Sequence, residues 1–507
     1  MDLRKNVTVK RIIVLLACFA GGLMFFAAPV AADTPVFKES LSPFPTAVEG
    51  WTAFGQSIRF TGDFLHMAYV VGRDKKFAVV RDGKIGPPYD SIGQDSPIFS
   101  PDGKRMAYKA KKGNAWHLVV DNKEQAPYDG GLALPLFSPD STRMLYVGKK
   151  GAQYCLVADG REVGCYDAVV KDYQTFSRDS NRWAVVVMKK EKQMIVTDGQ
   201  EGAAYEKVAP PLFSADGRRI VYSASRNGKW MIVADGKEGP AFDATGVYVF
   251  SPDSQHLYYA FKKGDKWGMM TDGKEGAATY DGFGIPAFSP DGQRMSQLAV
   301  RNEKWFMITD GREETSQWDE IVVLSHSPDS KRIAHNARRG KQWFMVVDGQ
   351  AQGPYDIASM AVFSSDSRHV AFAAKRGDKW LVVMDGREGK AYNTATTPLF
   401  SPDGKHISYL AQKEGIWLMV TDEKEGPAFA KVANPVWSPD SKHLAYMVER
   451  SDQWLVCVDG QPARNTFQGF LKGSNIQFIA PDRLRTLALR TGKAGPEFMT
   501  YEVEIQK

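Results

Sequence analysis

The eight histidines are the side chains of this chain best suited to bind a metal or to transfer protons. Five of them stand three residues after an aspartate that recurs along the chain, where other copies have arginine. The twelve positions are His66, Arg105, Arg143, Arg182, Arg219, His256, Arg294, Arg332, His369, His406, His443 and Arg485. A position that accepts only His or Arg needs a planar hydrogen-bond donor, which predicts a structural bond to a carboxylate or carbonyl.

The other signatures of catalysis are missing from the sequence. His117, His326 and His335 stand alone and form no HExxH pair. There is no calcium-binding loop of the EF-hand type, no phosphate-binding loop and no G-x-S-x-G elbow. We therefore expect no catalytic residue, no bound metal and no cofactor.

The elements that position these side chains form a repeat. Its aspartates are Asp63, Asp102, Asp140, Asp179, Asp216, Asp253, Asp291, Asp329, Asp366, Asp403, Asp440 and Asp482, spaced 37 to 42 residues apart. The copy at 211–243, PLFSADGRRIVYSASRNGKWMIVADGKEGPAFD, contains four short apolar segments separated by Gly-containing turns, which predicts four antiparallel strands. Repeats of this length and composition predict the blades of a β-propeller.

Aromatic residues recur at two further positions of the repeat. Ten units have an aromatic five residues before the Asp of the third turn, and most of these are tryptophan; Gln193 is the exception. A Tyr-Asp pair or a close variant, such as Tyr89-Asp90, ends many units. Large rings bury the most area per residue, so we expect them to pack one blade on the next.

The predicted fold class is therefore all-β, a propeller of about twelve four-stranded repeats. Twelve units exceed the four to eight blades of most rings. We expect two six-bladed rings in tandem, at 58–284 and 285–507, with one large ring as the alternative. To protect the sheet edges, part of 37–60 should pair with the last blade, including 500–505.

Four copies of the first turn carry a family resemblance. FSPDGKRMAY (99–108), FSPDGQRMSQ (288–297), FSPDGKHISY (400–409) and WSPDSKHLAY (437–446) resemble the TolB-type, WD-like propeller repeat of bacterial exported proteins. The resemblance implies a non-enzymatic scaffold that binds a protein or another ligand of the cell envelope. The alternative is an enzyme, for instance a carbohydrate-active one, with its site in the propeller channel.

The first 32 residues have the pattern of a secretory signal peptide. Lys10 and Arg11 precede an uncharged run, 12–32, that ends in small residues. The alternative is an uncleaved membrane anchor. The protein is thus expected to be exported, periplasmic or extracellular, with 33–57 as an extended lead-in. Cleavage would lower the net charge from +6 to +3, which gives no general argument for nucleic-acid or membrane binding.

Two cysteines of the expected mature chain, Cys155 and Cys165, flank the Asp159-Gly160 turn. A three-residue loop would place them opposite each other, as a disulfide requires, and an exported protein permits one. A two-residue loop would instead place Cys155 opposite Gly164.

Basic residues recur in the turn between the second and third strands, which lies on one face of a propeller. The proposed binding face comprises Lys111, Lys112, Lys149, Lys150, Lys189, Lys190, Lys262, Lys263, Arg338, Arg339, Lys375 and Arg376. Such a rim is either a solubility feature or a docking face for an anionic partner. The expected partners are an envelope protein or an anionic envelope polymer, and no nucleic acid.

Overall fold

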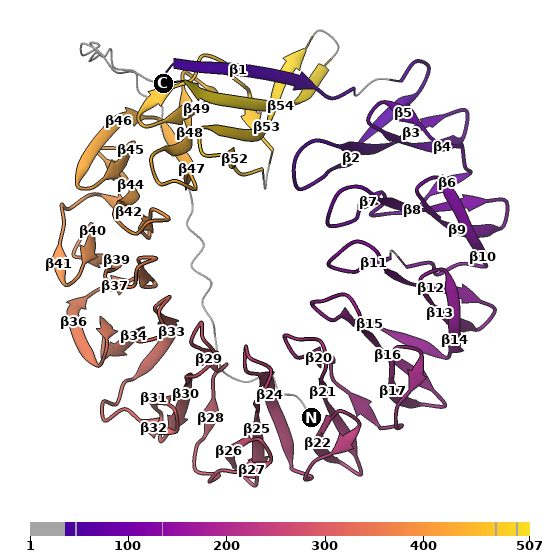
Figure 1. The fold of residues 1–507 in the computed structure, drawn as a ribbon, viewed down its shortest axis with the longest axis horizontal. Coiled ribbons are helices and arrows are strands. Elements are labelled where there is room, and N and C mark those ends of the chain that lie inside the picture. Colours follow the sequence, from indigo (N-terminus) through magenta and orange to yellow (C-terminus); the bar gives the residue numbers. More distant parts are fainter. Residues whose placement is uncertain (1–35, 46–47, 134, 472–473, 493–494, 507) are drawn as a thin grey trace.

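The computed structural model describes residues 36–45, 48–133, 135–471, 474–492 and 495–506. These residues form twelve β-sheets arranged as the blades of a single ring around a central channel (Figure 1). No helix long and apolar enough to span a bilayer is found among them. The expected signal peptide, 1–32, lies outside the described residues.

Each blade has a second, third and fourth strand, and its innermost strand is either continuous or broken into two short pieces. Blades 1 to 12 are β2–β5 (52–85), β6–β10 (91–128), β11–β14 (136–166), β15–β18 (168–201), β19–β23 (207–238), β24–β27 (244–275), β28–β32 (282–313), β33–β36 (320–355), β37–β41 (357–388), β42–β46 (394–429), β47–β50 (431–462) and β51–β54 (469–506) with β1 (36–43).

The turns follow from local sequence, as blade 5 shows. Its β21 (Ile220–Arg226) pairs antiparallel with β22 (Lys229–Ala234). The next turn places Asp235 at φ 51° and Gly236 at φ 78°. These two left-handed residues are what a two-residue hairpin turn needs to match the twist of its strands.

The hydrophobic core is divided among the blade junctions. At the junction of blades 4 and 5, Ile195 of one blade is buried with Tyr205 and Tyr222, whose rings lie 6.3 Å apart with their planes at 73°. The tryptophans of the third strands are only half-buried; Trp230, for example, lies opposite Phe242 of its own blade. The Tyr-Asp aromatics therefore make the larger contribution to blade-to-blade packing.

The recurrent His or Arg bonds to the aspartate of the third turn in eleven blades, at 2.7–3.4 Å. Arg182 shows the full arrangement. Its Nε bonds to Asp198 at 2.9 Å, its Nη1 donates to the carbonyl of Arg218 in the next blade, and its guanidinium lies over Phe213. The structural interpretation of this position is thus confirmed.

The ring is closed by pairing the two ends of the described chain. Strand β1 (Val36–Pro43) lies along the outer edge of the last blade, antiparallel to β54 (Gly495–Gln506), with Phe37 opposite Ile505 (Figure 1). Glu39 secures this edge by accepting hydrogen bonds from Tyr501 Oη at 2.6 Å and from the backbone N–H groups of Arg464 and Asn465. The predicted pairing of the lead-in with the last blade is confirmed.

The structure has one twelve-bladed ring where two rings, at 58–284 and 285–507, were expected. Two rings would require an interruption between blades 6 and 7, yet this junction is continuous. Asp281 accepts a hydrogen bond from the backbone N–H of Asn302, and the rings of Tyr258 and Phe288 lie 5.5 Å apart. Because β1 closes onto blade 12 and not onto a mid-chain blade, all twelve blades belong to one ring.

Candidate functional site

The predicted basic face is largely engaged in contacts within the propeller. Five of its residues bond to a glutamate of the fourth strand of the same blade: Lys112, Lys150, Lys189, Lys263 and Arg376. Arg338 bonds to Glu320, Arg339 lies over Trp318, and Lys149 lies over Tyr154. Only Lys111, Lys190, Lys262 and Lys375 make no direct ion pair or ring contact within the described part of the chain.

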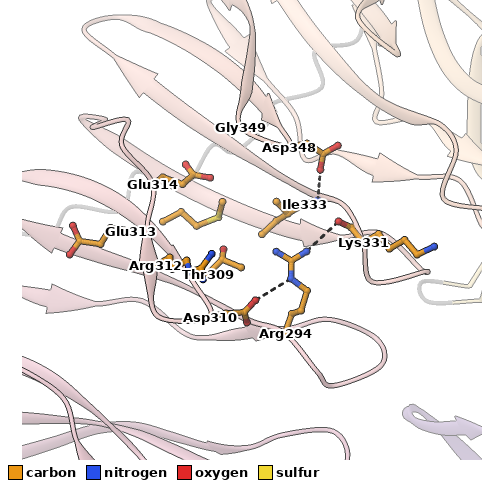
Figure 2. A pocket seen from close by; sticks show the side chains of 11 residues that line it. Arg294, Thr309, Asp310, Arg312, Glu313, Glu314, Lys331, Ile333, Asp348 and Gly349 are labelled. Atoms are coloured by element: carbon orange, nitrogen blue, oxygen red, sulfur yellow. Dashed lines mark hydrogen bonds and ion pairs between the residues drawn. The ribbon is translucent and has the colours of Figure 1, made fainter.

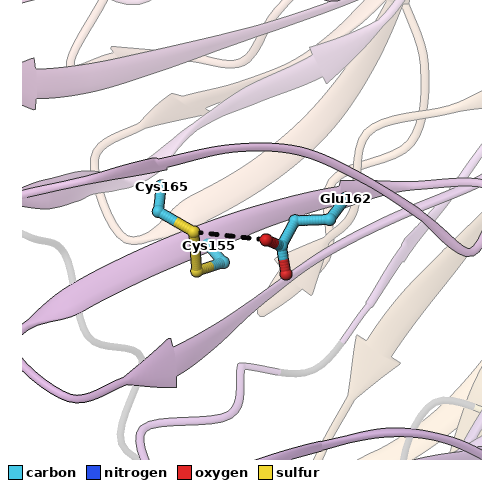
Figure 3. Close-up of side chains that lie close together, drawn as sticks. All are labelled: Cys155, Glu162 and Cys165. Carbon is cyan, nitrogen blue, oxygen red and sulfur yellow. Dashed lines mark hydrogen bonds between the residues drawn. A yellow bond between two sulfur atoms is a disulfide. The ribbon is translucent and has the colours of Figure 1, made fainter.

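A disulfide joins Cys155 and Cys165 (Figure 3). The turn has two residues, but a bulge near Leu156 shifts the register of the two strands by one, so that Cys155 lies opposite Cys165 and not Gly164. Glu162 lies beside them, with Oε1 3.5 Å from Cys165 Sγ. This is the one metal-like cluster that the described residues contain, and the disulfide leaves it no thiolate ligand.

Grooves recur at the blade junctions, on the face opposite the basic turns. The groove between blades 5 and 6 has a volume of about 550 Å³, and the one between blades 7 and 8 about 700 Å³. In the second, Arg294 bonds to Asp310 and donates to the carbonyl of Lys331 (Figure 2). The two grooves are built from equivalent positions of the repeat, so the residues that differ between them can be compared position by position.

Two facing positions distinguish the groove between blades 7 and 8. The first groove has Gly239 facing Tyr259, whose hydroxyl lies 3.4 Å from where a Cβ of Gly239 would be. The second has Glu314 and His335 at these positions. The backbone is the same, since Glu314 and Gly239 each donate their N–H to the third strand of their own blade. An acid has therefore replaced glycine, and a histidine has replaced the neighbouring tyrosine.

His335 is buried, Glu314 is partly buried, and few polar groups lie within bonding distance of either side chain. The side chain of His335 is 1% exposed and neither ring nitrogen has a hydrogen-bond partner among the described residues, while Glu314 Oε2 lies 3.8 Å from His335 Nε2. Burial raises the pKa of Glu314 to about 7 and lowers the pKa of His335 to about 4. Among the carboxyl groups of the described chain, Glu314 is the one whose pKa is raised.

Each of blades 5 to 9 has one or two exposed apolar side chains on its inner edge, which faces the channel in Figure 1, and Phe54 of blade 1 is a further one. Those of blades 5 to 9 are Leu212, Val247, Ile285, Val322, Ile357 and Met360, and we call this set the apolar arc. Ile285 is the most exposed, at 76%. At the position equivalent to Ile285, blades 10 and 11 have the exposed polar residues Thr397 and Asn434.

A small pocket of about 240 Å³ adjoins the apolar arc between blades 6 and 7. Its walls include Trp267, Phe283 and Val247, which belongs to the arc. Gln297 also lines it; the side chain is 2% exposed and its Nε2 donor has no partner. The pocket therefore combines apolar walls with one unused amide donor.

Sequence reasoning did not identify Gln297, Glu314 or His335 as site residues. The available signal was their position in the repeat. Gln297 and His335 occupy a position that is tyrosine in seven blades, and Glu314 one that is glycine in six. Departures from a regular pattern are where functional residues are expected.

Comparisons with known proteins support the fold alone. No protein-family model and no curated protein sequence matches the chain. Similar solved structures include a eukaryotic initiation factor (12% identity, 64% of this chain and 96% of that one, TM-score 0.34), TolB from Acinetobacter baumannii (13%, 50% and 77%, 0.22) and the tricorn protease (13%, 86% and 55%, 0.26). These likenesses are too weak to carry an argument about function. The resemblance to TolB-type repeats holds as far as the propeller fold.

Proposed function

We propose that this protein is an exported, non-enzymatic scaffold that binds a partner protein of the cell envelope at the apolar arc. The observation that carries the proposal is the recurrence of exposed apolar side chains on the inner edges of five consecutive blades. Exposed apolar side chains favour binding of a partner that covers them, because leaving them in water costs free energy. The export of the protein rests on its N-terminal sequence.

The pocket beside the arc indicates what kind of partner segment fits. Trp267 and Phe283 would enclose an apolar side chain, and Gln297 Nε2 would donate to a backbone carbonyl next to it. An extended segment with one large apolar residue meets both requirements. An anionic polymer is the weaker candidate, since eight of the twelve predicted basic residues are already engaged within the propeller.

Photo-crosslinking around the channel tests this proposal. A photoreactive phenylalanine analogue at Ile285 or Met360 should give a discrete adduct with one envelope protein in cells. The same analogue at Thr397 or Asn434, the equivalent positions outside the arc, should give none. The purified partner should then bind Ile285→Asp at least tenfold more weakly than the unmodified protein, and Thr397→Asp equally well. Equal labelling at all four positions, or none, would contradict the proposal.

An enzyme is the second candidate function, and Glu314 is the observation that favours it. A carboxyl group with a pKa of about 7 suits general acid–base catalysis. Glycoside hydrolysis needs a second carboxyl group, and the other three that line the groove, on Asp310, Glu313 and Asp348, are each paired with an arginine. Turnover of a panel of glycosides that Glu314→Gln abolished would establish an enzyme; unchanged background rates would reject it.

A further inference from the structure

The groove between blades 7 and 8 contains two charged groups, Glu314 and Arg312, that form no ion pair with another charged group of the described residues. Glu314 meets only the uncharged ring of His335, at 3.8 Å. Arg312 also lines the groove and forms no ion pair within the described residues. Lys331 acts on its own turn, where the Ser327 hydroxyl and the Lys331 charge both lower the pKa of Asp329. Every other charged side chain of the lining is paired: Arg294 with Asp310, and Glu313 and Asp348 with arginines beside the groove.

These two charges have opposite signs and different depths. Glu314 is partly buried beside the fully buried His335, whereas Arg312 is exposed. Figure 2 shows Arg312 and Glu314 on the same side of the groove, and Lys331 on the opposite side with its side chain extending away from them. Met307 and Ile333 add apolar wall. A matching ligand has a cationic group at depth, an anionic group toward the mouth, and an apolar part.

We propose that the groove between blades 7 and 8 binds a small zwitterion of the amino-acid or short-peptide class. Its ammonium group bonds to the Glu314 carboxylate, and its carboxylate bonds to the Arg312 guanidinium. The apolar part of the ligand packs on Met307 and Ile333. A volume of about 700 Å³ is ample for a ligand of this size.

Packing alone does not account for Glu314 and His335. The Gly–Tyr pair of the other groove fills the same space with no buried carboxyl. Replacing it with Glu and His leaves both ring nitrogens of His335 without partners and keeps Glu314 from full hydration. A ligand ammonium group would supply the missing countercharge.

Calorimetry with free amino acids and dipeptides tests the proposal. At least one member of the panel should bind, and blocking its amine by acetylation or its carboxylate by amidation should each weaken binding at least tenfold. The double substitution Glu314→Gly with His335→Tyr restores the pair of the other groove, so the variant should fold normally. It should bind the ligand at least tenfold more weakly.

A matched control is Lys237→Gln, which changes the residue equivalent to Arg312 in the groove between blades 5 and 6 and should leave binding unchanged. Three results would overturn the proposal: no heat from any amino acid or dipeptide at 10 mM, equal binding of the blocked forms, or full binding by the double variant. This site shares no residue with the apolar arc, so its failure would leave the proposed scaffold function standing.

Discussion

Replacing Glu314 with glutamine should have a more favourable effect on the free energy of unfolding at pH 8 than at pH 5. Burial raises the pKa of Glu314 from an ordinary 4.5 to about 7, while the neighbouring His335 stays neutral across this range. Between pH 4.5 and about pH 7, the folded state therefore keeps a proton on Glu314 that the unfolded state releases. Stability is fully present below about pH 4.5 and declines as the pH rises to about 7.

The size of the effect follows from the interval between the two pKa values. At ~1.4 kcal/mol per pH unit, this interval sets a ceiling of about 3 kcal/mol. The Glu314 side chain is 22% exposed, so water at the groove mouth offsets part of the penalty. We compare the free energy of unfolding of the glutamine variant with that of the unmodified protein at each pH. This difference should be about 1–2 kcal/mol more favourable to the variant at pH 8 than at pH 5.

Urea unfolding of both proteins at pH 5 and pH 8 measures this double difference, in which the constant cost of burying an amide cancels. Glu313→Gln is the matched control. Hydrogen bonds from Tyr280 and Arg301 lower the pKa of Glu313 below its ordinary 4.5, so its stabilising effect is lost only below about pH 4.5 and this substitution should cost nearly the same at pH 5 and at pH 8. A Glu314→Gln difference that is the same at both pH values would refute the account of this buried carboxyl group.

Three further predictions concern the ring itself. Deleting 36–43 removes the closing strand and exposes the edge of β54, so the melting temperature should fall by several degrees; an unchanged melting curve would show that closure adds nothing. Arg182→Leu should cost about 1–3 kcal/mol in urea unfolding, because it removes the ion pair with Asp198 and the hydrogen bond to the next blade, and leaves Asp198 only the backbone N–H of Trp183; a cost below about 0.5 kcal/mol would contradict this role. Cys155→Ser should lower the free energy of unfolding by about 3 kcal/mol, as expected for a disulfide that closes a loop of this length. A reductant should remove the difference between the two proteins, and equal stability in oxidising buffer would contradict the disulfide.

The repeat made most of the fold predictable from sequence. A period of 37 to 42 residues determines the number of blades, and Asp-Gly pairs such as Asp235-Gly236 determine the hairpins. The role of the His or Arg position was predictable, because the same hydrogen bond is made in many copies of the repeat and only these residue types can make it. The number of rings was not, since it depends on small angles between blades that many packed side chains set together.

The local details and the sites were harder to predict for different reasons. The bulge near Leu156 that brings Cys155 opposite Cys165 depends on one extra residue in a strand, which no turn motif reports. The basic residues were expected in the turn, yet all except Lys190 lie at the end of the second strand. Their glutamate partners, twelve residues further on in the fourth strand, were not foreseen. Glu314 was visible as a break in the glycine pattern, yet its burial required the structure.

Direct imaging of single particles by electron microscopy tests the central claim, because every site described above depends on one closed ring. Averages viewed down the ring axis should show twelve blades around one wide channel, with no gap where β1 (Val36–Pro43) meets β54 (Gly495–Gln506). Two adjacent rings of six blades, or one ring open between its first and last blades, would contradict the account.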